Sequence, residues 1–188
     1  MRKVSFAVLL GLTVGVLVGV SPAFGDRVEG TAGDDVLRGT GEHDRVFGFA
    51  GNDRAFGRGG RDIVRGGRGD DRVFGGTNLD GVFGGDGDDV LNGGLGGNDG
   101  LWGGPGADVL RGGRGKGPDY MTGGPGEDTL FLGPWVEQVE GNRGNDKVRL
   151  IEDGRPDFVN CGAGRDVVTI AGAREPNDII RPNCERIV

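Results

Sequence analysis

Histidine and cysteine, the side chains that most often carry enzyme or transition-metal chemistry, are almost missing from this sequence. It contains one histidine and two cysteines in 188 residues, and it has neither an HExxH nor a GxSxG motif. A zinc site or a nucleophilic triad therefore lacks the residues it needs. Glu137 and Glu140 offer a pair of carboxylates, but nothing in the sequence around them indicates a pocket. We expect no enzymatic activity.

Apolar residues are also scarce, because hydrophobic side chains make up only 35% of the chain. That is too little apolar mass for a thick core. Glycine, in contrast, occurs 44 times. This composition is typical either of a disordered glycine-rich chain or of a repeat fold whose core is a narrow stripe. The order of the residues has to decide between these two classes.

One long apolar run is present, at the start of the chain. A basic Met1-Arg2-Lys3 precedes the run Val4–Val20, and small residues follow as far as Gly25. This order is typical of a secretory signal peptide, so we expect residues 1–25 to be removed, by cleavage after Ala23 or after Gly25. A retained membrane anchor is the alternative, but the run is short for a membrane span and contains three glycines.

The charge of the chain indicates what it can bind. Removal of residues 1–25 deletes two cations and no acid, so the formal charge changes from −7 to −9. An acidic secreted chain is expected to bind cations and to bind nucleic acid poorly. The compartment outside the cell is oxidising, so the two cysteines favour a disulfide over a metal site.

A nine-residue repeat runs from Gly30 to Asn92 without a gap, in seven blocks. Position 1 is glycine, position 6 is aspartate and position 8 is aliphatic in all seven. Three features that hold their phase in this way favour an ordered repeat fold over disorder. The pattern then continues with slips. The later blocks are residues 93–102, 103–111, 112–122, 123–131, the degenerate 132–140, which loses the aspartate, and 141–149.

Blocks such as GGRGDDRVF and GGDGDDVLN resemble the G-G-x-G-x-D-x-U-x nonapeptide of RTX (repeats-in-toxin, hemolysin-type) calcium-binding proteins, where U is a large aliphatic residue. The resemblance covers residues 30–131 well and residues 141–149 fairly. It implies an all-β fold, a parallel β-roll that winds as a right-handed β-solenoid. It also implies Ca²⁺ as the bound ion.

The residue types fit calcium on physical grounds as well. We expect positions 1 to 6 to form a turn and positions 7 to 9 a short strand, with position 8 pointing inward. Two blocks then make one coil, so turns on one edge recur every 18 residues, and an ion between stacked turns can meet two carboxylates and several carbonyl oxygens. Calcium favours such an all-oxygen site, whereas magnesium demands a tighter octahedron. The candidate ligands are Asp35, Asp44, Asp53, Asp62, Asp71, Asp80, Asp89, Asp99, Asp108, Asp119, Asp128 and Asp146.

A single aspartate in a turn is more simply explained as a turn former that bonds its own backbone. An in-phase series of twelve favours calcium instead. The first blocks depart most from the consensus, because Thr31, Thr40, Phe49 and Arg58 replace the second glycine. We therefore expect weaker sites at the N-terminal end. The rows of like charge also predict that calcium binding and folding are a single event.

Aromatic residues recur at position 9, which points away from the core stripe. The 18-residue coil predicts that Phe56 and Phe74 are neighbours on one sheet. It makes Phe83 and Trp102 neighbours on the other, if the ten-residue block keeps phase. Such a patch could dock a partner or a glycan, or it could simply shield a thin sheet.

From residue 150 the glycine density falls. The segment 150–188 resembles the terminal segment of some secreted bacterial RTX-like proteins, with a Cys-Gly-x-Gly-x-Asp block at Cys161 and a Cys-Glu end at Cys184. The resemblance implies a cap that covers the open end of the solenoid and carries a Cys161–Cys184 disulfide. Asp157 and Asp166 lie near position 6 of two degenerate repeats.

The sequence thus predicts a signal peptide at 1–25, a repeat β-roll at 26–149 and a capping segment at 150–188. We expect a secreted, extracellular, non-enzymatic protein that binds several Ca²⁺ ions, has no membrane span after signal removal and binds no nucleic acid. A cell-surface adhesin or cell-wall module that uses the outward aromatics, with an envelope component as partner, is the alternative. A hydrolase or toxin fragment is a weaker one.

Overall fold

The computed structural model of the chain describes residues 25–135, 137–151, 153–172 and 177–188. The expected signal peptide, apart from Gly25, lies outside the described residues. In the described ranges the chain forms strands and turns and contains no helix long and apolar enough to cross a membrane.

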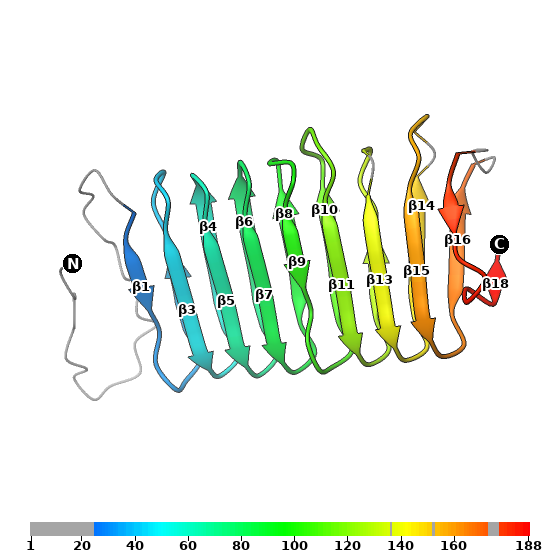
Figure 1. Cartoon of the computed structure of the whole chain (residues 1–188). Helices are drawn as coiled ribbons and strands as arrows, with labels where there is room; N and C mark the ends of the chain where they lie inside the picture. The colour runs from blue at the N-terminus through cyan, green and yellow to red at the C-terminus, as the bar shows by residue number, and fades with distance from the viewer. Residues whose placement is uncertain (1–24, 136, 152, 173–176) are drawn as a thin grey trace.

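The strands form two parallel sheets of nine strands each, and the chain alternates between the two sheets as it advances along the roll (Figure 1). We call them the odd sheet and the even sheet after the strand numbers. The odd sheet contains β1 (Arg27–Glu29), β3 (Arg45–Ala50), β5 (Ile63–Arg68), β7 (Gly81–Asp86), β9 (Gly100–Trp102), β11 (Tyr120–Pro125), β13 (Gln138–Arg143), β15 (Phe158–Ala163) and β17 (Ile179–Ile180). The even sheet contains β2 (Val36–Arg38), β4 (Arg54–Gly59), β6 (Arg72–Thr77), β8 (Val90–Gly94), β10 (Val109–Gly113), β12 (Thr129–Phe131), β14 (Lys147–Ile151), β16 (Val167–Ala171) and β18 (Arg186–Ile187).

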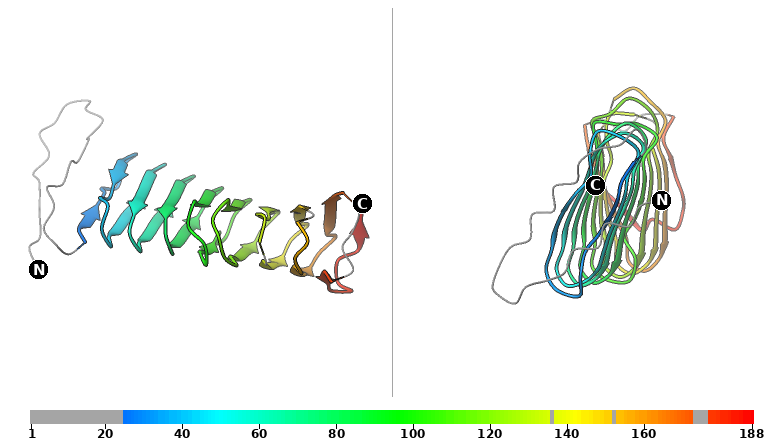
Figure 2. Two further views of the ribbon diagram at one scale, coloured as in Figure 1. Left: turned by 90° about the horizontal axis from the view of Figure 1, so that it is seen from above. Right: turned by 90° about the vertical axis from the view of Figure 1, so that its left-hand side faces the viewer.

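Strand register confirms the repeat. Val46, Val64 and Val82 are direct neighbours in β3, β5 and β7, at intervals of 18 residues. Leu101 and Met121 continue the same row at intervals of 19 and 20 residues, so the turns absorb the extra residues of the longer blocks. The expected all-β parallel solenoid of nonapeptide repeats is therefore confirmed. Seen along its axis, the roll has a narrow, flattened cross-section (Figure 2).

The core is a single stripe between the two sheets. The aliphatic residue at position 8 of each block is fully buried, and successive coils stack these side chains in line. Position 1 also faces inward and is normally glycine. In the C-terminal third, Leu132 and Leu150 take that inward place and are 2% and 1% exposed, and Ile170 packs against the same core. The last coils therefore hold more apolar mass than the earlier ones.

Most turns are shorter than the sequence predicts. β4 crosses from position 9 at Phe56 into the first three positions of the next block, so the chain leaves the sheet only at positions 4 to 6. Gly67 and Gly69, at positions 2 and 4, have φ values of 131° and 113°, a region that glycine enters freely. Phe49 and Arg58 occupy the equivalent of position 2 at φ values of 82° and 84°, which is unfavourable for residues with a Cβ.

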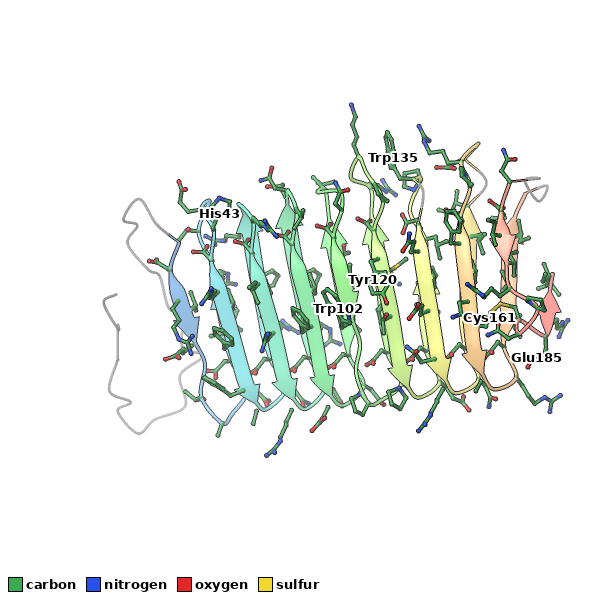
Figure 3. All side chains as sticks on the ribbon, viewed as in Figure 1. His43, Trp102, Tyr120, Trp135, Cys161 and Glu185 are labelled. Atoms are coloured by element: carbon green, nitrogen blue, oxygen red, sulfur yellow. A yellow bond between two sulfur atoms is a disulfide. The ribbon has the colours of Figure 1, made fainter. Side chains whose placement is uncertain are left out.

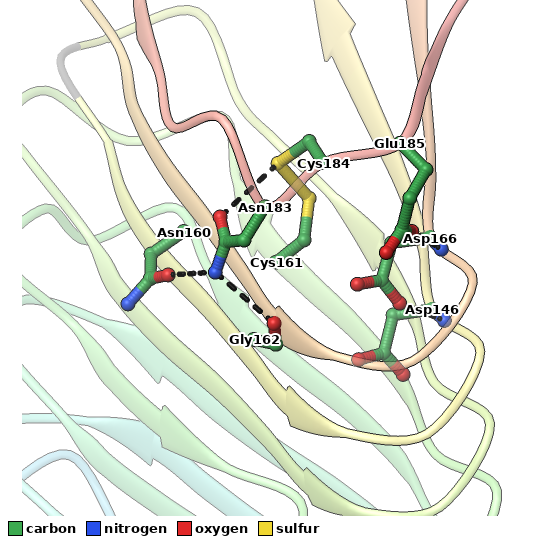
Figure 4. The surroundings of a disulfide bond; sticks show 8 residues. All are labelled: Asp146, Asn160, Cys161, Gly162, Asp166, Asn183, Cys184 and Glu185. Atoms are coloured by element: carbon green, nitrogen blue, oxygen red, sulfur yellow. Dashed lines mark hydrogen bonds between the residues drawn. A yellow bond between two sulfur atoms is a disulfide. The ribbon is translucent and has the colours of Figure 1, made fainter.

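The segment expected to cap the array is itself wound as further coils. β14 and β15 continue the two sheets, and the short strands β17 and β18 form the last strand of each. A disulfide joins Cys161 in β15 to Cys184, 23 residues later, just before β18. Figure 4 shows Asn183 beside this bond, where its side-chain NH₂ donates to Asn160 Oδ1 at 2.8 Å and to the Gly162 carbonyl at 3.1 Å. These contacts hold the end of the chain on the roll.

Candidate functional site

Carboxylates at position 6 form a hydrogen-bonded ladder along each edge of the roll. The backbone N–H of Asp53 donates to Asp71 Oδ1 at 2.7 Å, and the N–H of Asp71 donates to Asp89 Oδ1 at 2.8 Å. One edge, the Asp35 edge, carries Asp35, Asp53, Asp71, Asp89, Asp108, Asp128, Asp146, Asp166 and Glu185. The opposite Asp44 edge carries Asp26, Asp44, Asp62, Asp80, Asp99, Asp119, Glu137, Asp157 and Asp178.

The second oxygen of most of these carboxylates is buried and accepts no hydrogen bond. A buried polar atom without a partner costs about 1–3 kcal/mol, and more when it is charged, so native proteins rarely keep one without a reason. A whole row of such atoms fits a set of sites for a further bound group. Within the described residues the unpaired atoms are Oδ2 of Asp53, Asp62, Asp71, Asp80, Asp89, Asp99, Asp108, Asp128, Asp146 and Asp166, and Oε2 of Glu137.

Backbone carbonyls converge on the same places. A Cβ built on Gly75 would lie 2.7 Å from Asp80 Oδ2 and 2.7 Å from the carbonyl oxygen of Gly93, one coil further on. The absence of a side chain at position 1 thus leaves a space lined by a carboxylate oxygen and a peptide oxygen. Among the described residues, no three His, Cys, Asp or Glu side chains gather at one point. An ion held here would therefore depend on peptide oxygens, as calcium sites commonly do.

Burial raises the pKa values of these carboxylates, because it disfavours the ionised form when no counter-ion is present. Desolvation raises the pKa of Asp89 to about 8 and that of Asp80 to about 7, although a backbone N–H donor to each carboxylate opposes the change. Neighbouring carboxylates in the ladder raise both pKa values further. Near neutral pH the interior therefore needs protons or cations to balance its charge.

The twelve aspartates expected as ligands all lie on the two edges. Eleven of them are buried, and Asp35 is half-exposed at the N-terminal end. In the first two turns a threonine at position 2 satisfies the second oxygen. The backbone N–H and hydroxyl of Thr31 donate to Asp35 Oδ2 at 2.6 and 2.9 Å, and Thr40 does the same for Asp44 at 2.5 and 3.0 Å. These two turns therefore lack the unpaired oxygen that marks the later ones.

Glu137 belongs to the Asp44 edge, although its block was expected to lack a position-6 ligand because it loses the aspartate. Counting nine residues on from Asp128 would have found it. Its Oε1 accepts the N–H of Gly133 at 3.1 Å, and burial together with nearby Asp119 raises its pKa to about 9. A Cβ on Gly112 would lie 2.8 Å from Asp119 Oδ2 and 2.9 Å from Glu137 Oε2, so two carboxylates converge there.

The ladders also continue through the C-terminal segment. Asp157, Asp166 and Asp178 are buried and take the position-6 place of successive turns. Glu185 ends the Asp35 edge, where its Oε2 accepts the N–H of Asp166 at 2.5 Å (Figure 4). The sequence already placed Asp157 and Asp166 near position 6, whereas irregular spacing hid Asp178 and Glu185 from a strict nine-residue count.

The outward aromatics stack in pairs, as the coil predicted. The ring centroids of Phe56 and Phe74 are 4.9 Å apart with planes at 5°, and those of Phe83 and Trp102 are 4.6 Å apart at 7°. In each pair one ring face is therefore covered by the partner ring. Tyr120 lies beside Trp102 at 6.0 Å on the odd sheet (Figure 3). Because the rings stack on one another, this arrangement favours shielding of the sheet over a flat platform for a sugar.

Comparison with known families agrees with the geometry. The family model of the RTX calcium-binding nonapeptide repeat matches four times, over residues 23–53, 47–82, 83–117 and 115–134. These matches span residues 23–134, more than half of the chain. A search of curated proteins found no match. The chain therefore belongs to the family of RTX calcium-binding nonapeptide repeat proteins, and Ca²⁺ is the ion expected in its turns.

Proposed function

We propose that this is a secreted calcium-binding protein whose roll folds as Ca²⁺ ions enter the turns on both edges. The observation that carries the proposal is the row of buried carboxylate oxygens without hydrogen-bond partners. A divalent cation satisfies such oxygens and cancels the charge that burial disfavours. The ligands would be the position-6 aspartates from Asp53 to Asp146, with peptide oxygens of adjacent turns completing each site.

Folding on binding follows from the same arrangement. Each coil brings two more carboxylates into a narrow interior whose apolar part is little more than one stripe of aliphatic side chains. Without cations at neutral pH, the metal-free roll has to bury these charges or take up protons. Binding energy is then folding energy, as in other small metal-dependent domains.

Secretion fits both the chemistry and the sequence. RTX repeat proteins are typically extracellular, and the Cys161–Cys184 disulfide fits an oxidising environment. Extracellular calcium modules work at dissociation constants of about 10⁻⁴ to 10⁻³ M. A protein that meets such calcium levels only outside the cell would fold there.

The test is circular dichroism of the mature chain in EGTA and in millimolar calcium, with calorimetric titration alongside. We expect a disordered spectrum in EGTA, a β spectrum in calcium, and a much smaller response to magnesium. Identical β spectra in both conditions would contradict folding on binding. A calorimetric titration with no heat of binding would contradict the calcium sites themselves.

Docking through the outward aromatics is the second candidate, as in a cell-surface adhesin. The stacked Phe56–Phe74 pair argues for a structural role, since each ring covers a face of the other. Replacement of both residues by Ser separates the two roles. Shielding predicts a lower melting temperature and unchanged binding to cell envelopes, whereas docking predicts lost binding by a protein that still folds.

A further inference from the structure

The roll separates its charges between interior and surface. Of the 27 acidic residues in the described ranges, 15 are buried, while none of the 19 lysines and arginines is. Nineteen cations therefore face solvent against twelve acids (27 less 15). The formal charge of −9 thus misrepresents the outside of the molecule, because most of the negative charge lies in the two ladders.

The excess of basic over acidic residues is largest in the strands of the even sheet. Its nine strands contain no aspartate or glutamate at all. The odd-sheet strands, in contrast, contain the acids Glu29, Asp86 and Glu140 beside five cations. The even-sheet cations are Arg38, Arg54, Arg58, Arg72, Arg111, Lys147, Arg149 and Arg186. We call these eight residues the cationic face.

The cationic face is available to a ligand. Seven of its members are exposed and Arg38 is half-buried. None of the eight takes part in any ion pair found among the described residues. Arg54 and Arg72 are direct cross-strand neighbours, an arrangement of like charges that costs stability unless an anion lies between them.

Aromatic rings hold several of these guanidinium groups against the sheet. Phe131 lies between two of them, with the Arg111 guanidinium 4.5 Å and that of Arg149 5.4 Å from its centroid. Arg38 lies over Phe56 at 5.5 Å. Cation–π contacts of this kind limit the motion of the side chains while the N–H groups at their edges can still donate to an anion.

We propose that the cationic face binds an extended phosphodiester polymer laid along the axis of the roll. From β2 to β14 the face crosses six strand intervals, about 29 Å at about 4.8 Å each, which suits a polymer better than a small anion. Seven of the eight cations are arginine, whose planar fork matches the paired oxygens of a phosphate. Arg38 and Phe74 cover Phe56 from either side, and Arg111 and Arg149 do the same for Phe131. Recognition is therefore through the phosphate backbone and independent of bases.

A membrane surface fits this face less well. Large exposed apolar side chains, which anchor proteins in lipid headgroups, occur on the even sheet only at Ile151 and Ile187 among the described residues, near its C-terminal end. The proposal goes beyond calcium binding and needs only a folded roll. The proposal departs from the expectation, drawn from net charge alone, that nucleic acid is a poor ligand.

The test uses the mature chain in millimolar calcium and a fluorescent oligothymidylate of about 20 nucleotides as the phosphodiester probe. The first variant is Arg54→Gln/Arg72→Gln/Arg111→Gln/Arg149→Gln, on the even sheet. The control is Arg45→Gln/Arg65→Gln/Arg68→Gln/Arg143→Gln, which removes the same charge from the odd sheet. We expect affinity to fall steeply with salt between about 0.05 and 0.2 M. The even-sheet variant should lose at least about tenfold in affinity, and the control less than about threefold.

Circular dichroism in calcium checks that each variant is folded, and the double variant Arg54→Gln/Arg72→Gln replaces the fourfold one if that one is not. No salt-dependent binding by the wild type, or equal losses in both fourfold variants, would overturn the proposal. Tighter binding to heparin, polygalacturonate or anionic phospholipid vesicles than to the oligonucleotide would refute the assignment to a phosphodiester polymer. Because every measurement is made on folded protein, a negative result leaves the calcium proposal standing.

Discussion

The role of a single ladder carboxylate can be tested at Asp89. Its Oδ1 accepts the N–H of Asp71 at 2.8 Å, while its Oδ2 is buried without a hydrogen-bond partner. Asp89→Asn keeps the accepting oxygen and the shape of the side chain but removes the charge. If Asp89 were only a turn former, the change would affect stability in the same direction in the metal-free and the calcium-loaded states. If it is a calcium ligand, the two states should respond with opposite signs.

The expected magnitudes follow from burial. In EGTA, Asp89→Asn removes a desolvated charge that is repelled by Asp71 and Asp108, so the metal-free fold should gain about 1–3 kcal/mol. In saturating calcium the variant loses a ligand, and a tenfold weaker site costs about 1.4 kcal/mol. For a domain of this size, that loss lowers the melting temperature by about 3–6 °C.

The assay is thermal unfolding in calcium, together with folding in EGTA driven by trimethylamine oxide. The matched control is Asp88→Asn, one residue away, where the exposed carboxylate accepts the N–H of Ala107 at 2.8 Å. Asp88→Asn should change stability by no more than about 0.5 kcal/mol in either condition. An effect of the same sign in both conditions, or no difference from Asp88→Asn, would refute the ligand role.

Three further outcomes are expected. Gly75→Ala places a Cβ 2.7 Å from both Asp80 Oδ2 and the Gly93 carbonyl, so it should lower the melting temperature in calcium by about 2–12 °C, whereas Gly41→Ala, with no atom within 4 Å of its Cβ, should not lower it. Raised carboxylate pKa values stabilise the metal-free fold at low pH and cease to do so as pH rises through about 6 to 9. Circular dichroism in EGTA should therefore show more β structure near pH 5 than near pH 8, and calcium affinity should rise with pH over that range. Cys184→Ser should leave calcium-induced folding possible but raise the calcium concentration at its midpoint, and an unchanged midpoint would show that the disulfide adds no stability.

Much of this architecture could be predicted from the sequence, because each feature is local and repeated. Glycine at position 1, aspartate at position 6 and an aliphatic residue at position 8 determine the coil, its register and the place of the carboxylates. The stacking of Phe83 on Trp102 across the ten-residue block also followed from the count.

The remainder depends on contacts between coils, which no single block reveals. Each buried aspartate accepts a hydrogen bond from an N–H group one coil earlier. Glu137 is buried in the ladder in a block that has Leu132 at position 1, and its Oε1 accepts the N–H of Gly133 at position 2. The positive charge of the even sheet could not be predicted from composition either, because net charge does not separate inward acids from outward arginines.

The direction of the ladder bonds gives the roll a polarity. Every described bond in which one ladder carboxylate accepts the N–H of another runs from a coil to its successor, so the N–H of Asp53 is satisfied only once Asp71 is in place. A coil at the N-terminal end therefore stays incomplete until the residues behind it have arrived. In a chain that leaves the cell with its N-terminus first, each early coil would cross the membrane before the coil that completes it. The later segment closed by the Cys161–Cys184 disulfide would then supply the acceptors from which the earlier coils complete their hydrogen bonds in turn.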